Sequence, residues 1–327
     1  MDQHKVPALS LRHFADQKGE VWTYDKTRGK CWPAIPERTS VEAHYYSVER
    51  EDGTMDTSLE EAISEVEGAA APAYEKLTQG VMPKGSDREA FGHFLGLMYA
   101  RTPAMRRLAV SVHKQNMESV ISMRARHPQS FPQLLKHLAA KGHDVSDPEA
   151  VREQLTDLSH SELLVPRSWA LQIIGGSEKY AEIFLGMKWS LGQAEHHYFI
   201  TCDSPIYLAI DPATEHPVYG GHGLLNRTAE ITMAISRKRT LIMHWEAQAP
   251  YEVMLSRKWV EKENEKRAYS AEREVYSHLE HKDLVRLVAA FKGKGPQIRF
   301  SGPSGVEGFA GARVPRRWTS GKKISKA

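Results

Sequence analysis

The chain has 327 residues, of which 41% are apolar and 26% charged, and its formal net charge is +3. This composition is ordinary for a globular protein with a sizeable core and excludes a disordered or collagen-like chain. No apolar run is long enough to span a bilayer, and the start lacks the layout of a signal peptide, so we expect a cytoplasmic protein without membrane contact. The two cysteines, Cys31 and Cys202, lack a partner at metal-ligand spacing, which predicts free thiols.

The N-terminal segments predict short elements followed by a long helix. Residues 6–15 predict a short helix with Pro7 in its first turn. Residues 19–30 predict a strand that ends in a glycine-containing turn, and residues 44–49 a second strand. A long amphipathic helix is predicted from residue 58 to residue 77, because its apolar residues recur at helical spacing.

The next predicted helix runs from Asp87 to about residue 125, with Pro103 as a kink. Arg101 lies on its apolar face, where another apolar residue is expected. A guanidinium is costly to bury alone, so either this face opens onto a cavity or Arg101 meets an acidic partner. Glu67 is the natural partner, because it lies beside the apolar stripe of the preceding helix.

The second half of the chain changes from helices to strands. Further helices are predicted between residues 130 and 190, followed by short β-branched or aromatic segments that suggest an antiparallel sheet. A final helix is predicted from about residue 256 to residue 290. We therefore expect an α+β fold, predominantly helical, with one mainly antiparallel sheet built from N-terminal and C-terminal strands.

Residues 1–291 are predicted to form a single domain, and residues 292–327 a basic tail. The tail is rich in Gly, Pro and Ser and carries nine Lys or Arg against one Glu, which predicts a disordered or extended segment. Its cations are mixed with aromatic residues in a manner suited to phosphate contact and base stacking, so we expect either a nucleic-acid partner or a solvated, disordered terminus. The residues expected to make these contacts are Arg299, Arg313, Arg316, Arg317 and Trp318.

Seven segments, taken in order, resemble an uncharacterised bacterial family, the domain of unknown function DUF4238. They are HKVPALSLRHFAD followed by VWTYDK, then VEGAAAP, RTPAMR, FITCDSPIYL, EITMAISRKRTLIMHW and NEKRAYSAEREVYSH. The resemblance covers about residues 4–288 and implies no established activity. Lys5 replaces the usual tyrosine of the first motif, whereas His4 and Asp203 match the family pattern.

Three groups of residues leave alternatives open. The Arg101–Glu67 pair is either a buried ion pair that fixes helix register or an anion-binding arginine oriented by a carboxylate. Asp203 either projects into a cleft at a strand end or accepts backbone N–H bonds in a turn. His4 is either a packing residue with hydrogen-bond partners or a base or metal ligand.

Taken together, these residues predict a metal-assisted hydrolase of a phosphate-bearing or nucleic-acid substrate. His4, Glu67 and Asp203 are the predicted catalytic residues, and Arg12 and Arg101 the predicted anion-binding residues. The predicted ligands of a magnesium or manganese ion are Asp25, Glu67 and Asp203. The alternative is a non-catalytic binding or regulatory protein, with a structural Arg–Glu pair in its core and a partner-binding tail.

Overall fold

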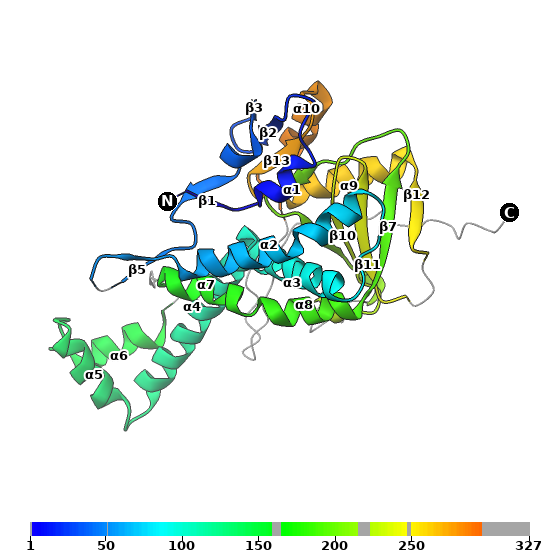
Figure 1. Ribbon diagram of the computed structural model, residues 1–327. Helices are drawn as coiled ribbons and strands as arrows, with labels where there is room; N and C mark the ends of the chain where they lie inside the picture. Colours follow the sequence, from blue (N-terminus) through cyan, green and yellow to red (C-terminus); the bar gives the residue numbers. More distant parts are fainter. Residues whose placement is uncertain (1, 51, 159–164, 215–222, 247–249, 296–327) are drawn as a thin grey trace.

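The computed structural model describes residues 2–50, 52–158, 165–214, 223–246 and 250–295. The fold is α+β, as predicted. A layer of helices lies against one large sheet, a smaller sheet lies beside it, and a helical arm extends from this body (Figure 1).

The helical layer consists of α2 (Ser58–Thr78), α3 (Ser86–Ala100) and α8 (Ser177–Gly186). The predicted amphipathic pattern of α2 is confirmed, since its buried residues include Ile63 and Tyr74. Helices α3 and α8 pack very closely at Gly96, where an added Cβ would lie 2.4 Å from the carbonyl oxygen of Ser177. A residue without a side chain is therefore needed at this crossing.

The prediction of one helix from Asp87 to residue 125 is wrong. Helix α3 ends at Ala100, and α4 (Pro103–Arg126) starts after a break. Pro103 lacks an N–H and disfavours a helical conformation of the residue before it, and Thr102 is indeed extended, with φ −60° and ψ 148°. The hydroxyl of Thr102 accepts the N–H of Met105, so the proline starts a new helix instead of kinking an existing one.

The large sheet has the strand order β12-β7-β11-β10-β9. All neighbouring strands are antiparallel except β12 and β7, which are parallel. One face of this sheet packs against α2, α3 and α8 in the main core, and the other is partly covered by α9 (Arg257–Ser270). The five strands are β7 (Lys188–Ala194), β9 (Ile206–Ala209), β10 (Glu230–Ala234), β11 (Arg239–His244) and β12 (Glu252–Leu255).

The smaller sheet has the strand order β3-β2-β13-β8 and joins both ends of the chain. Its strands are β2 (Val21–Asp25), β3 (Lys30–Ala34), β8 (Thr201–Cys202) and β13 (Glu274–Ser277). The prediction of a single sheet is therefore corrected to two main sheets. Strands β8 and β9 belong to different sheets although only residues 203–205 separate them.

The predicted final helix from residue 256 to residue 290 is also wrong. It is divided into α9 (Arg257–Ser270), strand β13 and α10 (Lys282–Ala290). The charge pairs that favoured a helix lie mostly in α9, whereas β13 contains the β-forming residues Val275 and Tyr276. The helices predicted between residues 130 and 190 also end too late, because Lys188 and Trp189 are the first residues of strand β7.

Short elements complete the body of the protein. Residues 44–47, predicted as strand, are mostly loop, and only Val48 and Glu49 form β5. Both cysteines are free, as predicted. The remaining body elements are β1 (Asp2–His4), α1 (Ala8–Arg12), η1 (Pro36–Arg38), β4 (Val41–Ala43), β5 (Val48–Glu49), β6 (Met55–Asp56), α7 (Arg167–Gly175), η2 (Pro212–Thr214) and η3 (Gly223–Leu225).

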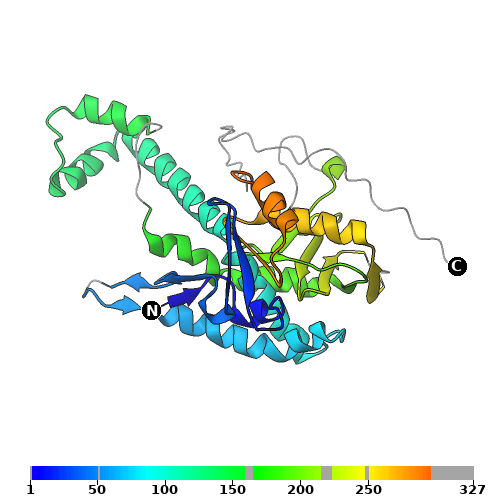
Figure 2. The ribbon, with the colours of Figure 1, turned by 90° about the horizontal axis from the view of Figure 1, so that it is seen from above.

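The helical arm consists of α4, α5 (Phe131–Ala140) and α6 (Pro148–Thr156). Seen from above, α4 carries α5 and α6 away from both sheets (Figure 2). The arm has a small core of its own, formed by Ala125, Phe131 and Leu134. None of the helices within the described ranges is long and apolar enough to span a bilayer.

Candidate functional site

Arg101 is buried between α3 and α4, and its predicted pairing with Glu67 is confirmed. Its side chain is 1% exposed, and Nη1 donates to Oε1 of Glu67 at 2.7 Å. Nη2 contacts the sulfur of Met98, also at 2.7 Å. The sequence thus located an ion pair between α2 and the end of α3, which explains why an arginine is tolerated on an apolar face.

A second carboxylate and a phenol complete the surroundings of Arg101. Burial raises the pKa of Glu60, and the charge of Glu67 raises it further, while Arg101 opposes both effects. Burial also raises the pKa of Tyr46, whose hydroxyl has no hydrogen-bond partner within the described part of the chain. The Arg101 cation is therefore balanced by protein groups and closed off from solvent.

Asp203 follows strand β8 and binds the backbone of a distant segment. Its Oδ1 accepts the N–H of Glu272 at 2.8 Å, and its Oδ2 accepts those of Arg273 and Glu274 at 2.8 and 3.0 Å. Burial raises the pKa of Asp203 to about 6, although these three hydrogen bonds act in the opposite direction. The carboxylate of Asp203 thus fixes the start of β13. Of the two alternatives for Asp203, the structure shows the acceptor of backbone N–H bonds, but these N–H groups belong to a segment about 70 residues away and not to a local turn.

Asp25 lies at the end of β2 and contacts the same segment from the other side. Its Oδ1 accepts hydrogen bonds from Thr27 and from the N–H of Arg28, while its Oδ2 accepts from Nε of Arg273 at 3.0 Å. Burial would raise the pKa of Asp25, but these hydrogen bonds outweigh it and lower the pKa to about 2. Arg273 therefore connects two of the predicted acids, through its N–H to Asp203 and its guanidinium to Asp25.

Four neighbouring residues that were not among the predicted site residues extend this cluster. Oε2 of Glu274 accepts the hydroxyl of Tyr276 at 2.8 Å and lies 3.6 Å from Nζ of Lys5. Ser40, beside Tyr276, has a left-handed backbone with φ 60°, an uncommon conformation for a residue other than glycine. Lys5, where the family pattern has tyrosine, thus has a buried acidic neighbour that only the pairing of distant strands reveals.

His4 and Arg12 lie on the N-terminal side of this cluster. His4 pairs with Val41 in the β1–β4 ladder, and its Nε2 is buried without a hydrogen-bond partner among the described residues. Arg12 forms an exposed ion pair with Glu37 at 2.9 Å. The pKa of Glu37 is lowered first by a hydrogen bond from the backbone N–H of Glu37 itself, and then by the side chains of Arg12 and His4. His4 and Arg12 therefore have Glu37 as a common neighbour.

The predicted site residues therefore fall into three neighbourhoods instead of one. Glu67 accompanies Arg101, Asp25 and Asp203 surround Arg273, and His4 and Arg12 lie near Glu37. Strand β1 runs between the first two, because the Gln3 side chain binds Tyr46 and Ser47 while Lys5 reaches Glu274. Within the ranges that the structure describes, no group of three or more His, Cys, Asp or Glu residues is arranged to hold a metal ion. The tail residues Arg299, Arg313, Arg316, Arg317 and Trp318 lie outside the described residues.

A hollow of about 320 Å³ on the large sheet contains none of the predicted residues. It is lined in part by Ser190 and His244, whose side chains lie 3.3 Å apart. The Oγ of Ser190 donates to the carbonyl of Pro250, and Nδ1 of His244 accepts the N–H of Glu246, which leaves Nε2 of His244 as the donor to Ser190. This proton arrangement is opposite to that of a serine nucleophile activated by a histidine base.

Comparison with known families agrees with the resemblance seen in the motifs. The model of a family described as a protein of unknown function, DUF4238, matches residues 2–281. The chain belongs to the DUF4238 family. No curated protein and no solved structure matches it. His4, Asp25, Glu67, Arg101 and Asp203 all lie within the part matched by the family model.

Proposed function

We propose that this DUF4238 protein is a non-catalytic nucleic-acid-binding protein with a structural Arg101–Glu67 pair and a partner-binding basic tail. The observation that carries the proposal is that the predicted catalytic acids are already engaged by the fold. Both oxygens of Asp203 accept backbone N–H groups, and Glu67 is paired with an arginine that is 2% exposed. Both acids therefore stabilise the structure, and Asp203, with both oxygens bound to backbone N–H groups, is not free to bind a substrate.

The partner is inferred from the charge of the tail. Residues 292–327 carry a net charge of +8, with Phe300 and Trp318 among the cations. Lys and Arg release counterions from a phosphate backbone, and aromatic rings stack on unpaired bases. This combination favours single-stranded nucleic acid as the partner of the tail.

A truncation after Gly295 tests the proposal. The carbonyl of Lys294 accepts a hydrogen bond from Nζ of the buried Lys26, so a truncation at this point retains that contact. Anisotropy of a labelled 20-nucleotide single strand, measured between 50 and 200 mM salt, should show weaker binding and a shallower salt dependence after truncation. Unchanged binding, with the same thermal unfolding midpoint as the full chain, would reject the role of the tail.

Metal-assisted hydrolysis is a second candidate function, and one observation favours it. The pKa values of Asp25 and Asp203, about 2 and about 6, differ strongly although both residues contact Arg273, as is common for acid and base pairs in enzymes. Thermal unfolding with and without magnesium, manganese and a nucleotide tests it, together with cleavage of a labelled oligonucleotide. A rise in the unfolding midpoint and cleavage that both depend on Asp203 would support hydrolysis. The absence of both effects would exclude it.

A further inference from the structure

Charge is segregated along the chain, and the arm carries a large share of the positive charge. The chain has 44 Lys and Arg and 41 Asp and Glu. Residues 103–143 contain seven of the Lys and Arg and one of the acids, and residues 292–327 contain nine Lys and Arg and one acid. The rest of the chain carries 28 Lys and Arg and 39 Asp and Glu, which gives it a net charge of −11. A polyanion is therefore repelled by most of the protein and attracted by the tail and by residues 103–143, which include α4 and α5 of the arm.

The cations at the end of the arm differ from those near the body. Close to the body, Arg106 lies over the ring of Tyr45, Arg107 pairs with Glu272, and Lys114 pairs with Glu118. Residues 119–143 contain four Lys or Arg, three His and no Asp or Glu. We call the four cations of this segment the basic tip; they are Arg124, Arg126, Lys136 and Lys141, and all are exposed.

The packing of the arm explains why the basic tip faces solvent. Ala125 is fully buried against α5, so Arg124 and Arg126, which flank it, are turned away from this contact. In α5 the inward residues are Phe131 and Leu134, which leaves the polar face of that helix exposed. No ion pair neutralises the basic tip within the part of the chain that the structure describes.

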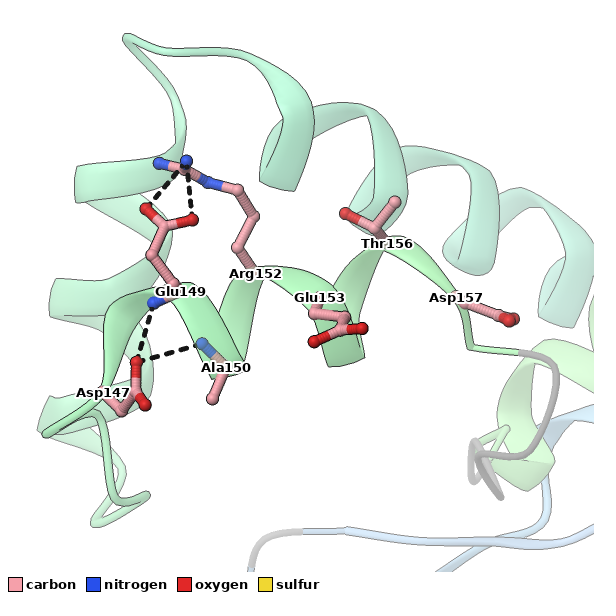
Figure 3. Close-up of a pocket in the computed structure, with 7 residues that line it drawn as sticks. All are labelled: Asp147, Glu149, Ala150, Arg152, Glu153, Thr156 and Asp157. Atoms are coloured by element: carbon pink, nitrogen blue, oxygen red, sulfur yellow. Dashed lines mark hydrogen bonds and ion pairs between the residues drawn. The ribbon is translucent and has the colours of Figure 1, made fainter.

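Helix α6 gives the other side of the arm the opposite charge. Figure 3 shows Asp147, Glu149, Glu153 and Asp157 along this helix, around a shallow hollow of about 560 Å³. Asp147 caps the helix by accepting two backbone N–H groups, and Arg152 is turned back onto Glu149 at 3.0 Å. The cation of α6 is thus already paired, and an anionic partner can approach the arm only from α4 and α5.

We propose that the basic tip binds the phosphate backbone of a double-stranded nucleic acid. This inference rests on the proposed function in taking nucleic acid as the partner. The one Phe, Tyr or Trp in residues 119–143 is Phe131, which is 2% exposed, so the tip offers no ring for base stacking and favours backbone contact. Helix α4 has 24 residues and spans about 36 Å, several times the Debye length of about 8 Å, so it separates the tip from the acidic body.

Neutralising the basic tip tests the proposal. The variant R124Q/R126Q/K136Q/K141Q removes four charges from the arm. The matched control K18Q/K30Q/K258Q/K262Q removes four exposed lysine charges from the body. With a labelled 24-base-pair DNA duplex, the arm variant should bind about tenfold or more weakly at 100 mM salt, and the slope of log K against log salt should fall by up to about 3.6. The control should bind within about twofold of the unmodified protein.

Combining the arm variant with the truncation after Gly295 separates this proposal from the role of the tail. Duplex binding that depends on the arm charges in both the full and the truncated chain supports the basic tip, whatever the tail does. Duplex binding that is equal for the arm variant and the control overturns it, even if single-strand binding still depends on the tail. Binding to vesicles with anionic lipid but not to the duplex would also overturn it. Circular dichroism of each variant confirms that the helices are retained.

Discussion

The Arg101–Glu67 pair permits a double-mutant cycle in which each single substitution leaves a different group unpaired. Glu67→Leu leaves the Arg101 guanidinium, with its side chain 1% exposed, without its closest countercharge. Breaking a buried pair in this way costs about 3–5 kcal/mol. Arg101→Met leaves Glu67, which is 22% exposed and can reach water, so the expected cost is about 1–3 kcal/mol.

The double variant R101M/E67L decides between the two interpretations of the pair. Replacing both charges by apolar side chains removes the desolvation cost together with the attraction, so we expect recovery to within about 1 kcal/mol of the unmodified protein. The coupling free energy, which is the sum of the two single costs minus the cost of the double variant, should then be about 3–8 kcal/mol. Urea unfolding followed by circular dichroism measures these values, provided that the m-value is unchanged.

The exposed pair between Arg12 and Glu37 is the matched control for this cycle. These two side chains are 58% and 47% exposed, and an exposed ion pair contributes less than about 1 kcal/mol. If Glu67→Leu destabilises the protein no more than Glu37→Leu does, the Arg101–Glu67 pair is not part of the scaffold. That result would reopen the interpretation of Arg101 as an anion-binding residue.

Three further predictions concern acids, glycines and a thiol. The pKa of Asp203 is raised to about 6 in the folded protein, so its contribution to stability is greatest below pH 4 and is lost as pH rises toward 6. The lowered pKa of Asp25, about 2, has the opposite effect, with stability lost as pH falls from 4 toward 2. The free energy of unfolding of the unmodified protein should therefore decline between pH 4 and 6, and this decline should be absent in D203N. A decline that persists in D203N would show that another group causes it. Gly96→Ala should destabilise the protein by about 1–3 kcal/mol, because the added Cβ meets the backbone of α8. Gly68→Ala has open space around the added Cβ and should stabilise the protein by about 0.5–1 kcal/mol. Urea unfolding that gives both substitutions the same sign would contradict this reasoning. Burial raises the pKa of Cys202 to about 12, so in a C31A variant, which lacks the partly exposed thiol, Ellman's reagent should label Cys202 only after unfolding. Rapid labelling of the native C31A variant would contradict the burial of Cys202.

Much of the local structure could be predicted from the sequence. The apolar spacing of α2 and the need of a buried guanidinium for a carboxylate were sufficient to place Glu67 beside Arg101. Strands β2 and β8 were also predicted, although β13, the strand that lies between them, was not. These features depend on residues close in sequence or on a single pair of adjacent helices.

Strand β13 and the environment of Asp203 were decided by tertiary structure. The segment around Glu274 is charged and follows a helix, so local propensity favoured continuing that helix. Three N–H groups bound by Asp203 and the pairing with β2 instead hold it extended, through contacts with residues about 70 and 250 positions away. Hydrogen bonds between residues far apart in sequence override weak local preferences, and the pattern of neighbouring residues does not predict such bonds.

The sequence by itself determined the α+β class, the family, the buried ion pair and the distribution of charge between body and tail. Only the tertiary structure decided which charged groups are used up by the fold and which are free. Asp25 and Asp203 are engaged by Arg273 and the backbone, whereas Arg124 and its neighbours are left exposed at the end of the arm. The physical reason is that a charge is neutralised by whatever lies within a few ångströms of it, and for these residues those neighbours come from distant parts of the chain.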